Sequence, residues 1–118
     1  MRNILKVMFA ITYTESNAST DGFTSCLKDR KIDYRVVSDK DNGYYLITFI
    51  KPESMENKEC IDIVSESAEI LESMRKENVI KFARITTYFK YKLHYTYIDK
   101  DYNTNFKKEL ISILEENI

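Results

Sequence analysis

Residues 82–98 alternate between two kinds of side chain almost without a break, which is the period-2 signature of an extended strand. On one face such a strand carries Ile85, Phe89, Tyr91, Leu93, Tyr95 and Tyr97. On the other face it carries Arg84, Thr86, Tyr88, Lys90, Lys92, His94 and Thr96. Seventeen extended residues span about 56 Å, which is more than a small sheet needs. We therefore expect a bulge or bend near Thr86 and Thr87 or near Lys90, or a strand that projects beyond the sheet.

The composition fits one folded domain. Hydrophobic residues make up 43% of the 118 residues and charged residues 31%, which argues against a disordered or membrane-embedded chain. The formal net charge of -1 gives no overall attraction to nucleic acid or membranes. Two cysteines are too few for a disulfide framework, which favours a cytoplasmic location. The apolar start is short and interrupted by Lys6, so we expect no signal peptide, and no window is apolar enough for a transmembrane helix.

The first part of the chain predicts a strand and a short helix. Residues 4–13 are β-prone and apolar on both faces, as a strand in the centre of a sheet requires. A polar stretch with several helix-capping candidates follows. Helical spacing then relates four residues of the stretch that ends at Lys31, namely Phe23, Cys26, Leu27 and Arg30.

Asn42 and Gly43 predict a hairpin, because both tolerate the positive φ that a two-residue type I′ turn needs. That turn would pair Lys40 with Tyr45, Ser38 with Ile47 and Val36 with Phe49 on the core face. The opposite face would still be partly apolar, with Arg35, Val37, Asp39, Leu46, Thr48 and Ile50.

Two more helices are predicted. Pro52 ends the hairpin, and a helix runs from about Ser54 or Asn57 to Glu77. Its apolar stripe consists of Cys60, Val64, Ala68, Leu71 and Met74, widened by Ile61, Ile63 and Ile70. A last helix after residue 105 directs inward Phe106, Leu110, Ile113 and Leu114.

The predicted elements follow the order β-α-β-β-α-β-α. This order most economically forms a four-stranded antiparallel sheet with helices on one face, the ferredoxin-like or split β-α-β arrangement, followed by a C-terminal helix. We therefore expect a single α+β domain over residues 1–118. Many unrelated functions share this fold, so function has to be argued from particular side chains.

Basic and aromatic side chains interleave on one face of the segment 82–98, where no Asp or Glu occurs between Arg84 and Ile98. Such a face can bind single-stranded nucleic acid, because cations pair with phosphates while bases stack on rings. The candidate residues are Arg84, Tyr88, Lys90, Lys92 and His94. The alternative is a solvated face that discourages edge pairing. The strand over residues 44–50 lacks the aromatic motif of an RNA-recognition module.

The long helix carries an acidic surface opposite its apolar stripe. No Lys or Arg occurs between Lys58 and Arg75, and carboxylates recur at three- and four-residue steps at Glu59, Asp62, Glu66, Glu69 and Glu72. This surface would complement a basic partner and accelerate its capture. The alternative is a solvated helix face whose acids are favoured by the positive N-terminal end of the helix dipole.

The sequence shows no catalytic constellation. His94 is the only histidine and has no cysteine or carboxylate at motif spacing. Cys26 and Cys60 fall on inward helix faces, where buried, inert thiols are expected. We therefore expect no enzyme, no metal and no cofactor.

The leading hypothesis is a non-enzymatic protein that binds another protein, in monomeric or homodimeric form and without membrane association. A bacterial immunity or inhibitor protein that occludes a basic effector, such as a nuclease toxin, would use the acidic helix in this way. One alternative is a nucleic-acid-binding domain that uses the basic strand face. Another is a small-molecule sensor or dimerisation module on an open sheet face, where Met8, Val37, Leu46 and Ile50 would be under-covered.

Overall fold

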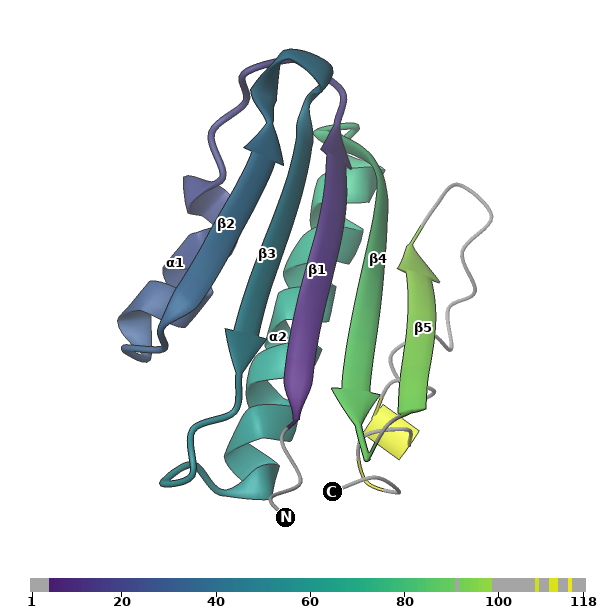
Figure 1. The fold of residues 1–118 in the computed structure, drawn as a ribbon. Coiled ribbons are helices and arrows are strands. Elements are labelled where there is room, and N and C mark those ends of the chain that lie inside the picture. The colour runs from purple at the N-terminus through teal and green to yellow at the C-terminus, as the bar shows by residue number, and fades with distance from the viewer. Residues whose placement is uncertain (1–4, 91, 99–107, 109–110, 113–114, 116–118) are drawn as a thin grey trace.

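The computed structural model describes residues 5–90 and 92–98, together with residues 108, 111, 112 and 115 (Figure 1). The helices are α1 (Asp21–Asp29) and α2 (Asn57–Lys76). The strands are β1 (Lys6–Tyr13), β2 (Tyr34–Asp39), β3 (Tyr44–Ile50), β4 (Ile80–Phe89) and β5 (Lys92–Ile98). The predicted α+β class is confirmed.

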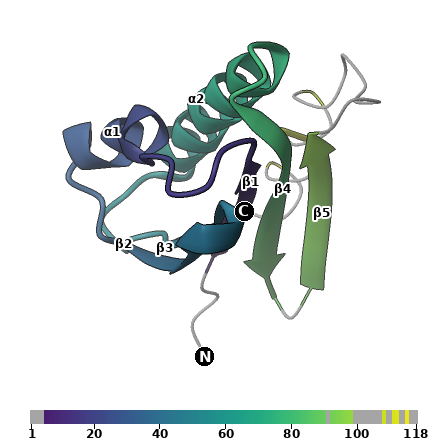
Figure 2. The same ribbon diagram turned by 90° about the horizontal axis from the view of Figure 1, so that it is seen from above.

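The strands form one antiparallel sheet in the order β2-β3-β1-β4-β5. As predicted, the first strand is central, and it pairs with β3 on one side and β4 on the other. Both helices lie on the same side of the sheet, which the view from above shows most clearly (Figure 2). The prediction of four strands is wrong, because the sheet has five.

The fifth strand arises because the segment 82–98 is a hairpin instead of one long strand. The chain reverses at Lys90, whose φ of 52° lies in the left-handed region. Phe89 then pairs with Lys92, and Ala83 pairs with Ile98. The reversal resolves the excess length noted in the sequence, since each half of the segment is about as long as β1, which β4 pairs with.

The hairpin of β2 and β3 has a longer loop than predicted. Residues Lys40–Asn42 form a turn of 3₁₀ helix and Gly43 adopts φ 68°, so four residues connect the strands. Ser38 therefore pairs with Tyr45, two residues away from the predicted partner Ile47. A shift of two residues keeps every side chain on its face of a sheet. The predicted division of this hairpin into two faces is accordingly confirmed.

The core lies between the sheet and the two helices. Alternate residues of β1 are buried there, and Phe9 packs edge-on against Phe23 of α1 with ring centroids 4.9 Å apart. The apolar stripe predicted for α2 is confirmed, and Ser67 joins it as a buried polar residue. The predicted C-terminal helix, with Phe106, Leu110, Ile113 and Leu114, falls outside the described residues.

Candidate functional site: the open face of the sheet

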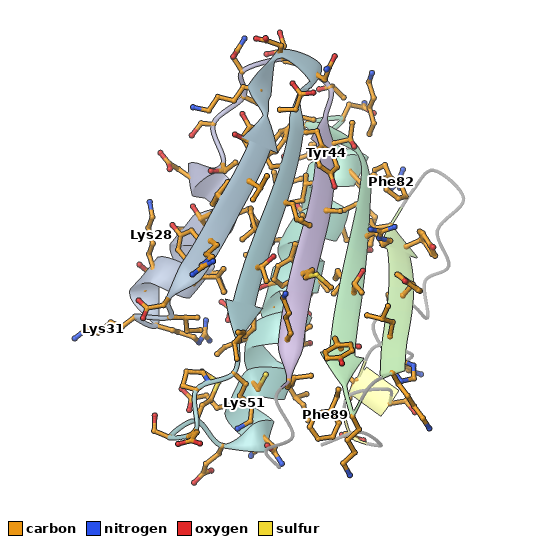
Figure 3. All side chains as sticks on the ribbon, in the orientation of Figure 1. Lys28, Lys31, Tyr44, Lys51, Phe82 and Phe89 are labelled. Carbon is orange, nitrogen blue, oxygen red and sulfur yellow. The ribbon has the colours of Figure 1, made fainter. Side chains whose placement is uncertain are left out.

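The sheet has a second face, here called the open face, which points away from α1 and α2 (Figures 1 and 3). The strand registers place on it alternate residues from all five strands. They are Arg35, Val37 and Asp39 of β2, Tyr44, Leu46, Thr48 and Ile50 of β3, Lys6, Met8, Ala10 and Thr12 of β1, Phe82, Arg84, Thr86 and Tyr88 of β4, and Leu93, Tyr95 and Tyr97 of β5.

The open face is unusually apolar for a surface in contact with water. Eight large hydrophobic or aromatic side chains are exposed among the described residues, and six of them gather here. Their exposed fractions range from 37% for Tyr44 to 64% for Val37. The other four are Ile50, Leu93, Tyr95 and Tyr97. Scattered exposed apolar residues are ordinary, but six on one face, three on β2 and β3 and three on β5, indicate an interaction surface.

Aromatic rings cluster at the β4–β5 end of the open face. The rings of Tyr95 and Tyr97 stack at 6.4 Å between centroids, and Phe82 lies 6.1 Å from Tyr97. The guanidinium carbon of Arg84 lies 5.3 Å from the centre of the Tyr95 ring, within the range of a cation–π contact. These contacts connect Phe82, Tyr97, Tyr95 and Arg84 in one continuous cluster.

Charges on the open face are few and mostly positive. Its cations are Lys6, Arg35 and Arg84, and its one carboxylate, Asp39, lies at the end of β2. The Asp39 carboxylate accepts a hydrogen bond of 2.7 Å from the Asn42 amide. Near Ile50, a groove of about 640 Å³ runs between Lys6 and Arg35. Asp33 also lines this groove, so the part of the face that combines apolar, aromatic and cationic groups without acids lies on β3, β1, β4 and β5.

The basic constellation predicted from the sequence is divided by the reversal at Lys90. Arg84 and Tyr88 lie on the open face, whereas Lys92 and His94 point to the side that carries the helices. Lys90 itself forms the turn, with its ammonium 5.2 Å from the Phe89 ring centre. The prediction of one continuous basic face is therefore wrong. The turn places three β5 residues on the same face of the sheet as Arg84, namely Leu93, Tyr95 and Tyr97. The sequence pattern had predicted them on the other face.

The predicted acidic surface of α2 is partly neutralised within the molecule. Glu66 forms a salt bridge of 2.6 Å with Arg30, which follows α1, and Glu72 forms one of 3.0 Å with Lys76. Glu69 also has an interaction partner. Only Glu59 and Asp62 are exposed without a salt bridge to any described residue. The acidic surface available to a partner is therefore smaller than the sequence indicates.

The two buried cysteine thiols have low reactivity. Both cysteines are buried, as predicted, and burial raises the pKa of Cys60 to about 11. Burial also raises the pKa of Cys26, whose sulfur accepts a hydrogen bond of 3.3 Å from Arg30 Nη1. Thiols in this state are poor nucleophiles, because the thiolate is the reactive form. Among the described residues, no three side chains of His, Cys, Asp or Glu are placed to hold a metal ion.

Within the described parts of the chain, neither helix combines the length and the apolar character that a membrane crossing requires. Comparison with models of known protein families gives no match, and a search of curated proteins gives none. The candidate site is therefore argued from its own geometry.

Proposed function

We propose that this chain is a non-enzymatic, cytoplasmic binding protein that holds another protein on its open face. The observation that carries the proposal is the gathering of six of the eight exposed large hydrophobic or aromatic side chains on this one face. An antiparallel sheet with one solvated face normally alternates apolar and polar residues, so that the outward face is polar. This sheet departs from that rule across β3 and β5.

The kind of side chain favours a protein partner. Tyrosine, methionine and arginine are enriched at protein interfaces, while Lys, Glu and Asp are depleted from their centres. The open face has Met8 on its central strand and Arg84 beside a tyrosine, and its lysine and aspartate lie at strand ends. A partner that matches it presents an apolar patch bordered by carboxylates, which would pair with Lys6, Arg35 and Arg84.

We also infer that β1 to β4 with the two helices form a ferredoxin-like unit, to which β5 is added at one edge. The added strand supports the proposed function directly, since it supplies Leu93, Tyr95 and Tyr97 to the open face. The unit by itself assigns no function.

A second candidate is the occlusion of a basic effector, such as a nuclease toxin, through the acidic surface of α2. The observation in its favour is that Glu59 and Asp62 are exposed without a salt bridge to described residues. A bacterial immunity or inhibitor protein of this kind would bind a partner of opposite charge from the one that the open face fits.

One capture experiment separates these candidates. The immobilised chain is exposed to extract of its source organism, in wild-type form, as the double variant Tyr95→Ser with Tyr97→Ser, and as the double variant Glu59→Lys with Asp62→Lys. We expect the amount of protein captured to fall at least about tenfold with the tyrosine variant and to stay unchanged with the charge variant. Both substitutions change exposed side chains, so circular dichroism and melting temperature serve as folding controls.

The reverse pattern would transfer the function to the acidic surface of α2. Titration with short single-stranded RNA and DNA is the remaining arm. Tight binding that weakens steeply as salt rises would contradict a protein partner and favour the nucleic-acid alternative, with Arg84 and Tyr88 as its contacts.

A further inference from the structure

β2 is an exposed edge of the sheet. Among the described residues it pairs with β3 alone, and the register of this pair has no bulge. Both of its valines are exposed, Val37 by 64% on the open face and Val36 by 44% on the side of the helices. Sheet edges are usually protected by proline, bulges or an inward charge, because unpaired backbone groups recruit another strand. The sequence of β2 contains no proline, so neither proline nor a bulge protects this edge, and its two charges, Arg35 and Asp39, lie on the open face.

The hydrogen bonds of the neighbouring strands show which backbone groups of β2 are unpaired. The N–H of Tyr13 donates to the carbonyl of Gly43 at 2.8 Å, and the N–H of Lys51 donates to the carbonyl of Leu5 at 2.9 Å. Odd-numbered residues of β3 therefore bond to β1, and even-numbered residues bond to β2. Their β2 partners are Arg35, Val37 and Asp39. The N–H and C=O groups of Tyr34, Val36 and Ser38 consequently point out of the sheet.

A second copy of the chain can pair with this edge only by matching even-numbered residues with even-numbered residues. When Val36 bonds to Ser38 of the second copy, Val37 faces Val37 and Arg35 faces Asp39, twice by symmetry. When Val36 bonds to Val36, Arg35 faces a valine and Asp39 faces no residue of β2. When Ser38 bonds to Ser38, Asp39 faces a valine. Among residues of β2 itself, only the first register places opposite charges across from each other, and it opposes no like charges within the strand.

We propose that two copies of this chain associate through antiparallel pairing of their β2 strands, with the twofold axis at Val37 and with Arg35 facing Asp39 across the interface. Residues facing across a non-hydrogen-bonded position are the closer kind of pair, with Cα atoms about 4.5 Å apart, so the two charges are within reach. The pairing is isologous and closes as a dimer. It joins two sheets into one and places both open faces on the same side.

Charge exchange tests the register. The assembly state of purified protein is measured by sedimentation over a dilution series, since dimers dissociate on dilution. Arg35→Asp and Asp39→Arg each place like charges across the interface, and we expect each to weaken self-association at least about tenfold. The double variant Arg35→Asp with Asp39→Arg restores the pair and the dimer. Lys58→Asp makes the same charge change on α2 and leaves the dimer intact.

A backbone variant tests the edge itself. Val36→Pro removes an N–H that points out of the sheet, so the pairing of β2 with β3 survives while the dimer is lost. Circular dichroism and thermal melting confirm that the monomer remains folded.

Two results would overturn the proposal. One is a wild-type chain that sediments as a monomer at every concentration. The other is a dimer that is indifferent to Arg35→Asp and Val36→Pro but is lost in the double variant Tyr95→Ser with Tyr97→Ser, because that dimer would use the open face. The first result leaves the proposed function untouched, whereas the second would assign the open face to a second copy of this chain, so the outcomes distinguish the two proposals.

Discussion

Gly43 is the residue whose identity the loop between β2 and β3 most requires. Its φ of 68° lies in the left-handed region, which residues with a Cβ rarely adopt. A Cβ at this position would also meet the carbonyl oxygen of Tyr13 at 3.0 Å and that of Glu15 at 3.1 Å. Both obstacles belong to the backbone and cannot rotate away. The close approach is needed because the Tyr13 N–H donates to the Gly43 carbonyl.

Gly43→Ala should therefore destabilise the protein by about 2 kcal/mol or more, from unfavourable φ together with steric overlap. Gly22→Ala is the matched control. Gly22 lies exposed in α1 with no atom within 4 Å of a new Cβ, and alanine favours helix, so stability should rise by up to about 1 kcal/mol. Urea unfolding of both variants measures the difference. Equal effects of the two substitutions would contradict this account of the loop.

At the scale of elements, apolar periodicity was sufficient for β1 and α2. Both bury a pattern that their own sequence shows, with alternate residues in β1 and a helical stripe from Cys60 to Leu71. The apolar pattern of the sequence does not show the reversal inside residues 82–98. Turns are usually marked by Gly, Asn or Asp, and here a lysine adopts the positive φ. The two-residue loop shifts the in–out phase by one residue, but β5 carries its large apolar side chains on the open face, so the alternation in the sequence shows no break at the turn.

A correct prediction of the open face required knowing that the chain reverses at Lys90. The sequence predicted the apolar character of its β2–β3 half, including Val37, Leu46 and Ile50, and the structure places these residues together. It assigned Tyr95 and Tyr97 to the face opposite Arg84, because a missed turn inverts every later residue of a strand. The sequence did not indicate the salt bridge between Arg30 and Glu66 either, since Arg30 follows α1 and only tertiary packing brings it to Glu66 of α2.

Lys90→Gly distinguishes a hairpin from a continuous strand. Glycine adopts positive φ without steric cost, which should stabilise the hairpin, while the contact between Lys90 and the Phe89 ring is lost. The net change in the free energy of unfolding should lie between zero and a gain of about 1 kcal/mol. Lys81→Gly, inside β4, should instead cost about 1 kcal/mol. Chemical denaturation compares the two. A large loss at position 90 would mean that this residue lies in extended chain.

For the whole molecule, burial of neutral ionisable groups sets an alkaline limit to stability. Burial raises the pKa of Cys60 from 9.0 to about 11 and, with help from Tyr45, that of Tyr13 from 10.0 to about 12. Burial raises the pKa of Cys26 as well. The unfolded chain therefore releases these protons at lower pH than the folded chain does. Folding is favoured in full below the unfolded values and loses free energy as pH rises towards the folded ones.

We expect the free energy of unfolding to decline from about pH 9 upwards, with a slope of up to about 1.4 kcal/mol per pH unit for each group being titrated. Cys60→Ala removes one contribution, so its stability should fall less steeply between pH 9 and 11 although it starts lower. Ala68→Gly, a substitution without a titrating group on the same buried side of α2, should keep the wild-type slope. Denaturant melts at stepped pH measure both. Identical slopes for wild type and Cys60→Ala would show that the Cys60 thiol does not contribute to the loss of stability at alkaline pH.

β1 comes first in the chain yet lies at the centre of the sheet. Its two hydrogen-bonding neighbours, β3 and β4, are synthesised much later, so a nascent chain leaves the ribosome with a segment that is apolar on both faces and unpaired. Contacts between residues far apart in the sequence form slowly, and strands that are still unpaired are prone to aggregate. The interval before translation reaches β4 is therefore when a holdase chaperone would protect this protein most.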